Sequence, residues 1–182
     1  MSRIGRAPIT IPAGVKIDLN TNSEVIVTGP KGSLRQWVDT SCINVNVQDN
    51  TVVLTRNSEV NEVKAKHGLY RALIANMVKG VTEGYTKSIT IHGVGYKCAV
   101  QGNKIVLNIG FSHPVNIEIP QGLTATCPTA TEIVVAGIDK TAVGQFAADI
   151  KALKKVEPYH GYGIYYTNEP VRRKEIKKGK KK

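Results

Sequence analysis

An internal repeat, with a spacing of 81 residues, constrains the fold of this chain more than any other feature. Shifting the chain by this distance aligns, without a gap, Val25 with Val106, Gly29 with Gly110, Leu34 with Val115, and residues 52–54 with 133–135. The hairpin turn at residues 20–23 falls on 101–104 in the same way. Because the order of strands and turns recurs throughout, the sequence predicts two tandem copies of one unit.

The first copy begins with an alternating pattern that is typical of strands joined by tight turns. Strands are predicted at 15–19, 24–28, 34–38, 43–47 and 52–54, with turns at 20–23, 29–32 and 48–50. Before them, residues 2–12 carry Arg3 and Arg6 together with Pro8 and Pro12. Prolines at this density predict an extended arm rather than a helix.

The period then changes to that of a helix. From Glu59 onward apolar residues recur at spacings of three and four, which is the pattern of one helical stripe, with His67 among them as a packing residue. Ser58 is the expected N-cap and Gly80 the expected C-cap. The second copy repeats this helix at residues 139–153.

The predicted fold class is therefore α+β, with two tandem copies of one small unit and a basic C-terminal extension. In each copy an antiparallel β-sheet is covered by one α-helix. We expect a first repeat with a basic N-terminal arm at 1–81, a second repeat at 82–156 and a Gly/Tyr-rich basic tail at 157–182.

Charge is concentrated in the last fifth of the chain. Residues 151–182 hold eleven Lys and Arg against three acids, within a formal net charge of +11 for the whole chain. Such a balance favours a polyanionic partner, with nucleic acid first and an anionic membrane surface second. The alternative is a solvated charged tail that follows an edge strand. Gly161 and Gly163 permit either close approach of a ligand or a positive φ.

The remaining motifs do not assemble into a catalytic or metal site. Gly93-Val94-Gly95-Tyr96 is followed by a predicted strand, which indicates a turn rather than a dinucleotide loop. The three cysteines are widely spaced and favour a reducing compartment over disulfides or zinc. No apolar run spans a membrane, and the N-terminus lacks the core of a signal peptide. We therefore expect no enzyme activity, no cofactor, no membrane partner and no small-molecule substrate.

Arginine, lysine, tyrosine and glycine in the arm and tail suit contacts with structured RNA, because cations bind phosphate and aromatic rings stack on unpaired bases. His113, in a turn between strands, offers an exposed imidazole to phosphate or only forms the turn. The predicted RNA-binding residues are Arg3, Arg6, Lys87, His113, Lys154, Lys155, Tyr159, His160, Gly161, Tyr162, Gly163, Arg172, Arg173, Lys174, Lys177 and Lys178.

Ordered motifs along the whole chain carry a family resemblance. They are Ser2-Arg3-Ile4-Gly5, Gly29-Pro30-Lys31-Gly32, His67-Gly68, Arg71-Ala72-Leu73, Asn76-Met77-Val78, Gly84-Tyr85, Gly93-Val94-Gly95-Tyr96, Ser112-His113-Pro114-Val115 and Glu157-Pro158-Tyr159. The chain resembles the bacterial-type large-subunit ribosomal protein L-six family. The resemblance implies a cytoplasmic ribosomal protein, although an organelle ribosome is an alternative.

The resemblance also implies the partners. They are large-subunit rRNA near the sarcin–ricin loop and the stalk base, neighbouring large-subunit ribosomal proteins, and translational GTPases that dock nearby. The chain departs from the family's Tyr-Lys-Gly-Lys-Gly pattern after Glu-Pro, since His160 and Tyr162 occupy the two lysine positions. An adaptor for another polyanion or for an anionic membrane is the alternative function.

Overall fold

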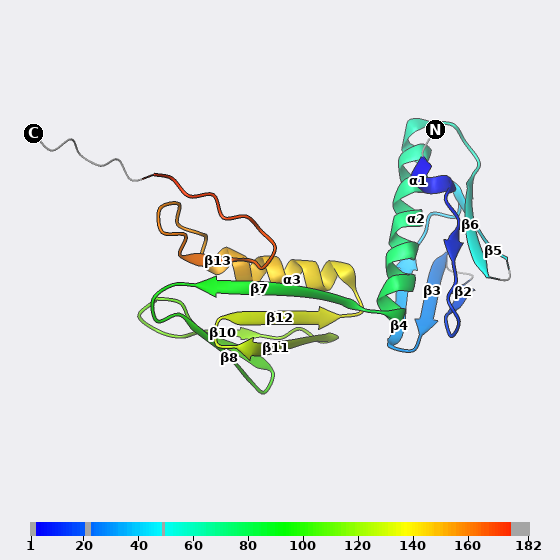
Figure 1. The fold of residues 1–182 in the computed structure, drawn as a ribbon. Helices are drawn as coiled ribbons and strands as arrows, with labels where there is room; N and C mark the ends of the chain where they lie inside the picture. The colour runs from blue at the N-terminus through cyan, green and yellow to red at the C-terminus, as the bar shows by residue number, and fades with distance from the viewer. Residues whose placement is uncertain (1–2, 21–22, 49, 176–182) are drawn as a thin grey trace, which may run out of the picture. The chain divides into compact units, whose positions relative to one another are not determined.

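A computed structural model describes residues 3–20, 23–48 and 50–175 of the chain. The chain divides into two compact units. Unit 1 comprises residues 1–85 with 138–140, and unit 2 comprises residues 86–137 with 141–182. Both combine antiparallel strands with one long helix (Figure 1), which confirms the α+β class and the tandem duplication. Each unit holds two small sheets where the sequence predicted one.

Unit 1 contains two three-stranded sheets, in the orders β1-β6-β5 and β2-β3-β4. The long helix α2 lies along them (Figure 1). The elements are α1 (Arg3–Arg6), β1 (Ile9–Thr10), β2 (Lys16–Leu19), β3 (Glu24–Gly29), β4 (Gly32–Trp37), β5 (Ile43–Gln48), β6 (Thr51–Arg56) and α2 (Asn61–Thr82).

The core of unit 1 follows the predicted periodicities. Val25 and Val27 on β3 are fully buried, and Val52 and Leu54 on β6 are buried in the same alternation. Ile74 supplies the centre of the helical stripe and is also fully buried. Burying an aliphatic side chain of this size contributes about 1.5–3 kcal/mol, so these strands and the helix stabilise one another.

The predicted extended arm is wrong at its start, because Arg3–Arg6 form a single turn of helix, α1. The prolines that exclude a helix begin only at Pro8. Gly5 on α1 lies against the ring of His67, so close that a Cβ at residue 5 would lie 2.6 Å from Nδ1. His67 is buried and its Nε2 lies 3.0 Å from the Leu54 carbonyl oxygen, so the predicted packing role is confirmed.

Both predicted caps of α2 are also wrong. The N-cap is Val60, and the Ser58 hydroxyl accepts a hydrogen bond from the Val60 N–H instead of capping the helix. At the other end α2 continues through Gly80 to a C-cap at Glu83. Gly84, at φ +79°, takes the left-handed conformation that the sequence analysis assigned to Gly80. The helix needs a glycine at position 80 for packing, because a Cβ there would collide with the Ile138 carbonyl oxygen.

Unit 2 contains a three-stranded sheet, β10-β9-β8, and a four-stranded sheet, β11-β12-β7-β13. Its helix α3 buries Val143, Phe146, Ala147 and Ile150. The elements are β7 (Tyr85–His92), β8 (Lys97–Gln101), β9 (Lys104–Asn108), β10 (Val115–Glu118), β11 (Leu123–Thr129), β12 (Glu132–Gly137), α3 (Lys140–Leu153) and β13 (Gly163–Tyr166). The 93–96 segment is the predicted turn, with Gly95 at φ +72°.

The gapless alignment of the two copies is wrong between β2 and β4. Leu19 pairs with Val25 in unit 1, whereas Val100, at the position of Leu19, pairs with Ile105. The buried counterpart of Val25 is therefore Ile105 and not Val106. Counted between paired residues, the turn between β8 and β9 is one residue shorter than the turn between β2 and β3. Counted in the same way, the connection between β9 and β10 is one residue longer than that between β3 and β4, so the original alignment resumes at β10. This shift keeps the apolar side chains on the core face, since a slip of one residue would turn them all outward.

Candidate nucleic-acid interface

Strand β13 anchors the C-terminal part of unit 2. It pairs antiparallel with β7, with Gly163 opposite His92 and Tyr166 opposite Ile89. Ile164 is fully buried and fixes the strand in the core. β13 is the outer strand of its sheet, so the edge strand that the sequence analysis kept as an alternative is present. Two segments flank it, the 157–162 loop before and the 170–175 segment after.

A carboxylate organises the 157–162 loop. Glu157 Oε1 accepts the N–H of Tyr159 at 2.8 Å, and Oε2 accepts the N–H of His160 at 2.7 Å. The backbone of Glu157 closes the loop by donating to the Tyr162 carbonyl and accepting from the Gly161 N–H. The hydrogen bond from the His160 N–H, more than any other contact, lowers the pKa of Glu157 below its ordinary value. The loop conformation is thus stabilised by a charged acceptor.

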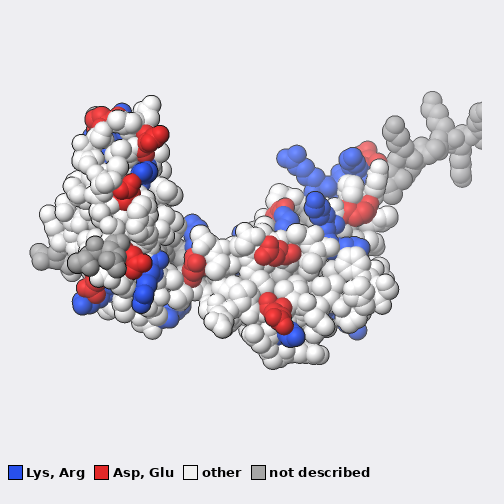
Figure 2. All heavy atoms as spheres, turned by 180° about the vertical axis from the view of Figure 1, so that it is seen from behind, with Lys and Arg blue, Asp and Glu red and all other residues white. Residues whose placement is uncertain are grey.

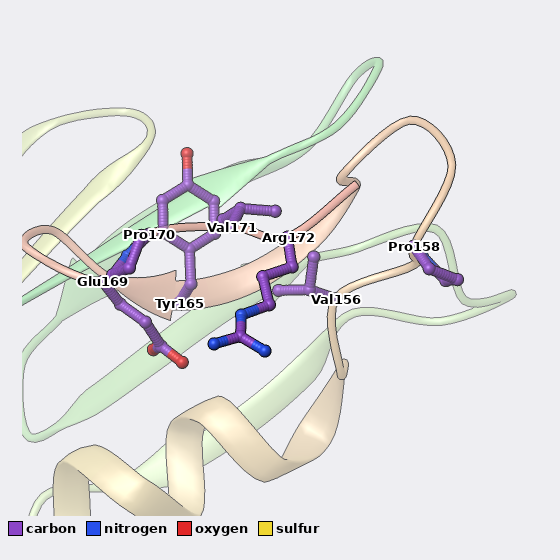
Figure 3. A pocket seen from close by; sticks show the side chains of 7 residues that line it. All are labelled: Val156, Pro158, Tyr165, Glu169, Pro170, Val171 and Arg172. Atoms are coloured by element: carbon purple, nitrogen blue, oxygen red, sulfur yellow. The ribbon is translucent and has the colours of Figure 1, made fainter. Parts of the chain in front are cut away.

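The 170–175 segment lies beside this loop. The Lys174 N–H donates to the Pro158 carbonyl at 2.7 Å, and the guanidinium of Arg173 packs against Gly161. Between loop and segment is a hollow of about 300 Å³ (Figure 3), lined by Val156, Pro158, Tyr165, Glu169, Pro170, Val171 and Arg172. The charged ends of Arg172 and Glu169 point to the same side of the β13 ribbon.

Two lysines converge on the ring of Tyr166. The ammonium of Lys87, on β7, lies 4.3 Å from the ring centroid, and that of Lys151, on α3, lies 4.6 Å from it. Lys151 also pairs with Glu169 at 2.5 Å, and this contact is the main reason why the pKa of Glu169 is lowered. Lys87 borders a second hollow of about 310 Å³ that is otherwise lined by Thr86, Ser88, Tyr166, Thr167 and Asn168.

Lys154 links the end of α3 to the loop that contains His113. Its ammonium lies 4.8 Å from the ring centroid of Phe111. His113 is exposed in the same connection between β9 and β10, as the sequence analysis predicted for a turn. A cation over an aromatic face is attracted by the ring quadrupole, so this contact holds Lys154 near the β9–β10 connection.

Several cations here form no ion pair with an acid within the described part of the chain: Lys154, Lys155, Arg172, Arg173 and Lys174. Figure 2 shows Lys and Arg side chains gathered at one end of unit 2. Uncompensated cations keep their charge available to a polyanion, whereas an ion pair would neutralise it locally. The arrangement therefore suits a phosphate backbone.

The structure brings some predicted residues together and separates others. Tyr159, His160 and Tyr162 of the 157–162 loop lie beside Arg172, Arg173 and Lys174, while Gly161 and Gly163 are buried between them and the core. Arg3 and Arg6 lie on α1, which belongs to unit 1. Lys177 and Lys178 lie outside the described residues.

The two glycines have intramolecular roles. Gly161 and Gly163 take the predicted positive φ, at +76° and +146°. A Cβ at Gly163 would lie 2.7 Å from the Val156 Cα, so this buried glycine lets two parts of the backbone approach each other. A Cβ at Gly161 would lie 2.9 Å from Arg173 Nε. Both glycines therefore act by allowing close packing beneath the surface.

Sequence reasoning missed three residues that build the site. Glu169 was counted only as an acid, and Glu157 only as an acid and as part of a family motif, yet each orders a backbone segment. His92 was not assigned to the site, although its Nδ1 lies 3.3 Å from the Gly161 carbonyl oxygen. The spacing of Glu157 before two turn N–H groups is a local signal that identifies the acceptor. His92 carries no such signal, because it reaches the loop only through the register of β7 and β13.

The described residues offer little for other chemistry. Within them, no group of three or more His, Cys, Asp or Glu side chains is placed to hold a metal ion. Nor is any helix in the described ranges both long and apolar enough to cross a bilayer.

Comparison with known proteins identifies the family of the chain. The model of the family described as Ribosomal protein L6 matches residues 11–84 and 92–167, one match for each copy. The chain is 53% identical over 181 residues to the large ribosomal subunit protein uL6 of Clostridium kluyveri, and the match covers all of both chains. It is 50% identical, over the same extent, to the protein of that name from Clostridium botulinum strain Eklund 17B. The resemblance seen in the motifs is thereby confirmed, and the chain belongs to the ribosomal protein L6 family.

Proposed function

We propose that this chain is a structural constituent of the large ribosomal subunit that binds large-subunit rRNA through the C-terminal surface of unit 2. The observation that carries the proposal is the set of cations without acid partners around the ordered 157–162 loop and 170–175 segment. Each cation that neutralises a phosphate releases condensed counterions, which favours binding. The ordered backbone presents these charges with little further loss of entropy.

Family membership bears on the other assignments. The chain is a ribosomal protein and not an enzyme, and its partners are rRNA and other ribosomal proteins. The relatives are bacterial proteins named for the large subunit, which supports a place on cytoplasmic ribosomes.

The proposed address on the subunit is the rRNA near the sarcin–ricin loop and the stalk base, where the chain would support docking of translational GTPases. The match between this chain's Glu157-Pro158-Tyr159 motif and the family pattern supports this address. Chemical footprinting of the rRNA, with and without the chain, tests it. We expect protection in that region, and protection confined to other regions would refute the address.

Salt dependence tests the role of the cations. The triple variant Arg172→Gln, Arg173→Gln, Lys174→Gln should weaken binding to an rRNA fragment. The slope of log affinity against log salt should become shallower by roughly 2–3, since each phosphate contact contributes roughly 0.7–0.9. The matched control removes three lysines that pair with acids in unit 1: Lys16→Gln, Lys64→Gln, Lys79→Gln.

The two variants lose the same charge, so equal slopes would show that the unit 2 surface has no special role. Liposomes that contain anionic lipid serve as the competing partner. The membrane adaptor would be favoured over the ribosomal function if the chain bound these liposomes without RNA at a salt concentration at which it does not bind the rRNA fragment.

A further inference from the structure

Three aromatic rings form a column at the tip of the 157–162 loop. The rings of His160 and Tyr162 are stacked, with centroids 5.3 Å apart and planes inclined by 15°. On the Tyr162 side the ring of His92 follows at 5.5 Å, with a tilt of 41°. His92 belongs to β7, so the column begins on a paired strand of the sheet and ends on the loop.

The backbone holds the column in place from several directions. The N–H of His160 donates to Glu157 Oε2, and the Glu157 N–H donates to the Tyr162 carbonyl. His92 Nδ1 lies 3.3 Å from the carbonyl oxygen of Gly161, the residue between the two stacked rings. The rings are therefore positioned before any ligand arrives, and binding to them costs little conformational entropy.

One end of the column is open. The side chain of His160 is 60% exposed, although one face of its ring is covered by Tyr162. The other face is available to a flat partner. Among the described residues, the carboxylate of Glu157 approaches the imidazole, with Oε2 at 3.4 Å from Nδ1, and it is already engaged by two backbone N–H groups.

A cation lies against the residue that follows His160 in the loop. The guanidinium of Arg173 packs against Gly161, the residue after His160, and no acid among the described residues pairs with it. The Lys174 N–H anchors the same segment to Pro158. A flat aromatic surface beside an uncompensated guanidinium matches the two halves of a nucleotide, the base and the phosphate.

We propose that the outer face of His160 stacks on one unpaired nucleobase of the bound RNA, while Arg173 binds a neighbouring phosphate. The inference rests on the proposed RNA-binding function and adds the class of ligand at this point of the surface. A base within a duplex has both faces covered by its neighbours, so the site selects an unstacked nucleotide. Histidine is among the side chains on which such bases stack.

The test compares two RNA probes of about 10 nucleotides, a length within the range of single-strand sites. One is a single-stranded oligoadenosine that contains 2-aminopurine, and the other is a duplex of the same length. The variants are His160→Leu, which removes the aromatic ring, and His160→Phe, which keeps it without a ring nitrogen. Trp37→Leu is the matched control, since Trp37 is an aromatic residue on β4 of unit 1, is 55% exposed and belongs to no part of the candidate interface.

We expect His160→Leu to weaken binding of the single strand about 5- to 150-fold and to abolish the quenching of 2-aminopurine fluorescence. His160→Phe and Trp37→Leu should bind like the wild type, and none of the three changes should alter duplex binding. Thermal unfolding of each variant checks that the loop change leaves the fold intact.

Three outcomes would overturn the inference. His160→Leu binding the single strand like the wild type would remove the stacking contact. Equal losses for single strand and duplex, or a His160→Phe variant as weak as His160→Leu, would show that His160 acts through charge or hydrogen bonding. These results would leave the proposed function standing, whereas a wild-type chain that binds neither probe nor the rRNA fragment would overturn both.

Discussion

Unit 1 and unit 2 use the same order of strands, yet they differ at the positions of β1 and β7. In unit 1 the two-residue strand β1 pairs with β6 and forms the edge of its sheet. In unit 2 the eight-residue strand β7 occupies the corresponding position and lies between β12 and β13. A long strand with a free edge is a template for a further strand. The second copy thus has room for β13, and with it for the loop and segment that carry the interface.

The charges of the two units differ in the same direction. Five cations of unit 1 lie in ion pairs with acids: Lys16, Arg56, Lys64, Lys66 and Lys79. In unit 2 Lys151 pairs with Glu169, whereas the cations of the 170–175 segment lack such partners within the described residues. At least half of the cations of residues 1–80 are thus paired with acids, whereas those of the 170–175 segment are not, as far as the described chain extends. The difference comes from residues added after α3.

The largest expected effect is on stability, and it tests whether the two units unfold independently. Ile74 on α2 and Ile150 on α3 are both fully buried. Ile74→Ala and Ile150→Ala should each lower the free energy of unfolding of their own unit by about 2–5 kcal/mol, because each leaves a cavity. Trp37, the single tryptophan, lies in unit 1, so its fluorescence in a urea titration reports that unit alone.

Circular dichroism in the far ultraviolet follows both units together. Ile150→Ala should shift the circular dichroism transition and leave the Trp37 transition in place. A shift of Trp37 fluorescence by Ile150→Ala as large as that by Ile74→Ala would mean that the two units unfold as one, and the comparison would lose its thermodynamic basis.

A smaller effect distinguishes the two helices through their glycines. Gly80→Ala should destabilise unit 1 by about 1–3 kcal/mol, because the added Cβ meets the Ile138 carbonyl oxygen. Gly144→Ala should instead stabilise unit 2 by about 0.5–1 kcal/mol, since Gly144 is exposed within α3 and a Cβ there meets nothing within 4 Å. Thermal or urea unfolding measures both. Changes of the same sign would contradict the packing reason for Gly80.

The smallest effect concerns the ion pairs of unit 1. Lys66 Nζ lies 2.8 Å from Asp39 Oδ2, and its hydrogen bond, together with that from the Ser41 hydroxyl, lowers the pKa of Asp39 from 3.8 to about 2. A carboxyl whose pKa is lower in the folded state stabilises it above its unfolded pKa, and loses this contribution as the pH falls through its folded pKa. Asp39→Asn should therefore reduce stability at pH 7, and the difference from wild type should vanish near pH 2.

Urea titrations of Trp37 fluorescence across this pH range measure the difference. Asp18→Asn is the control, because the Asp18 pair with Lys16 is exposed and such pairs contribute little. A difference for Asp39→Asn that is constant from pH 7 to pH 2 would show that the loss comes from packing and not from charge.

Most strands and both long helices were predictable from the sequence, because alternation and helical spacing are local patterns that burial enforces. The sequence did not predict that α2 continues past Gly80, since local rules favour a helix end at glycine. A glycine is needed at this position because it packs against the Ile138 backbone, which lies far away in the chain. The one-residue shift between the two copies at Val106 was not predicted for a related reason. Val106 and Ile105 are both apolar, and only strand pairing shows which of them faces the core.

At the site, the charge of the tail and the glycines with positive φ followed from composition and residue type. The ring column did not, because its three members come from positions that no local pattern connects.

The sequence by itself determined the family, the duplication, the core faces and the excess of positive charge at the C-terminal end. These properties depend on residue type and on spacing over a few turns or strands. Only the tertiary structure decided how the charge is presented. Pairing of Gly163 with His92 brings the 157–162 loop onto β7, and hydrogen bonds then place the 170–175 segment beside it. Contacts between residues about seventy positions apart depend on register and close packing, which become defined only when the whole unit folds.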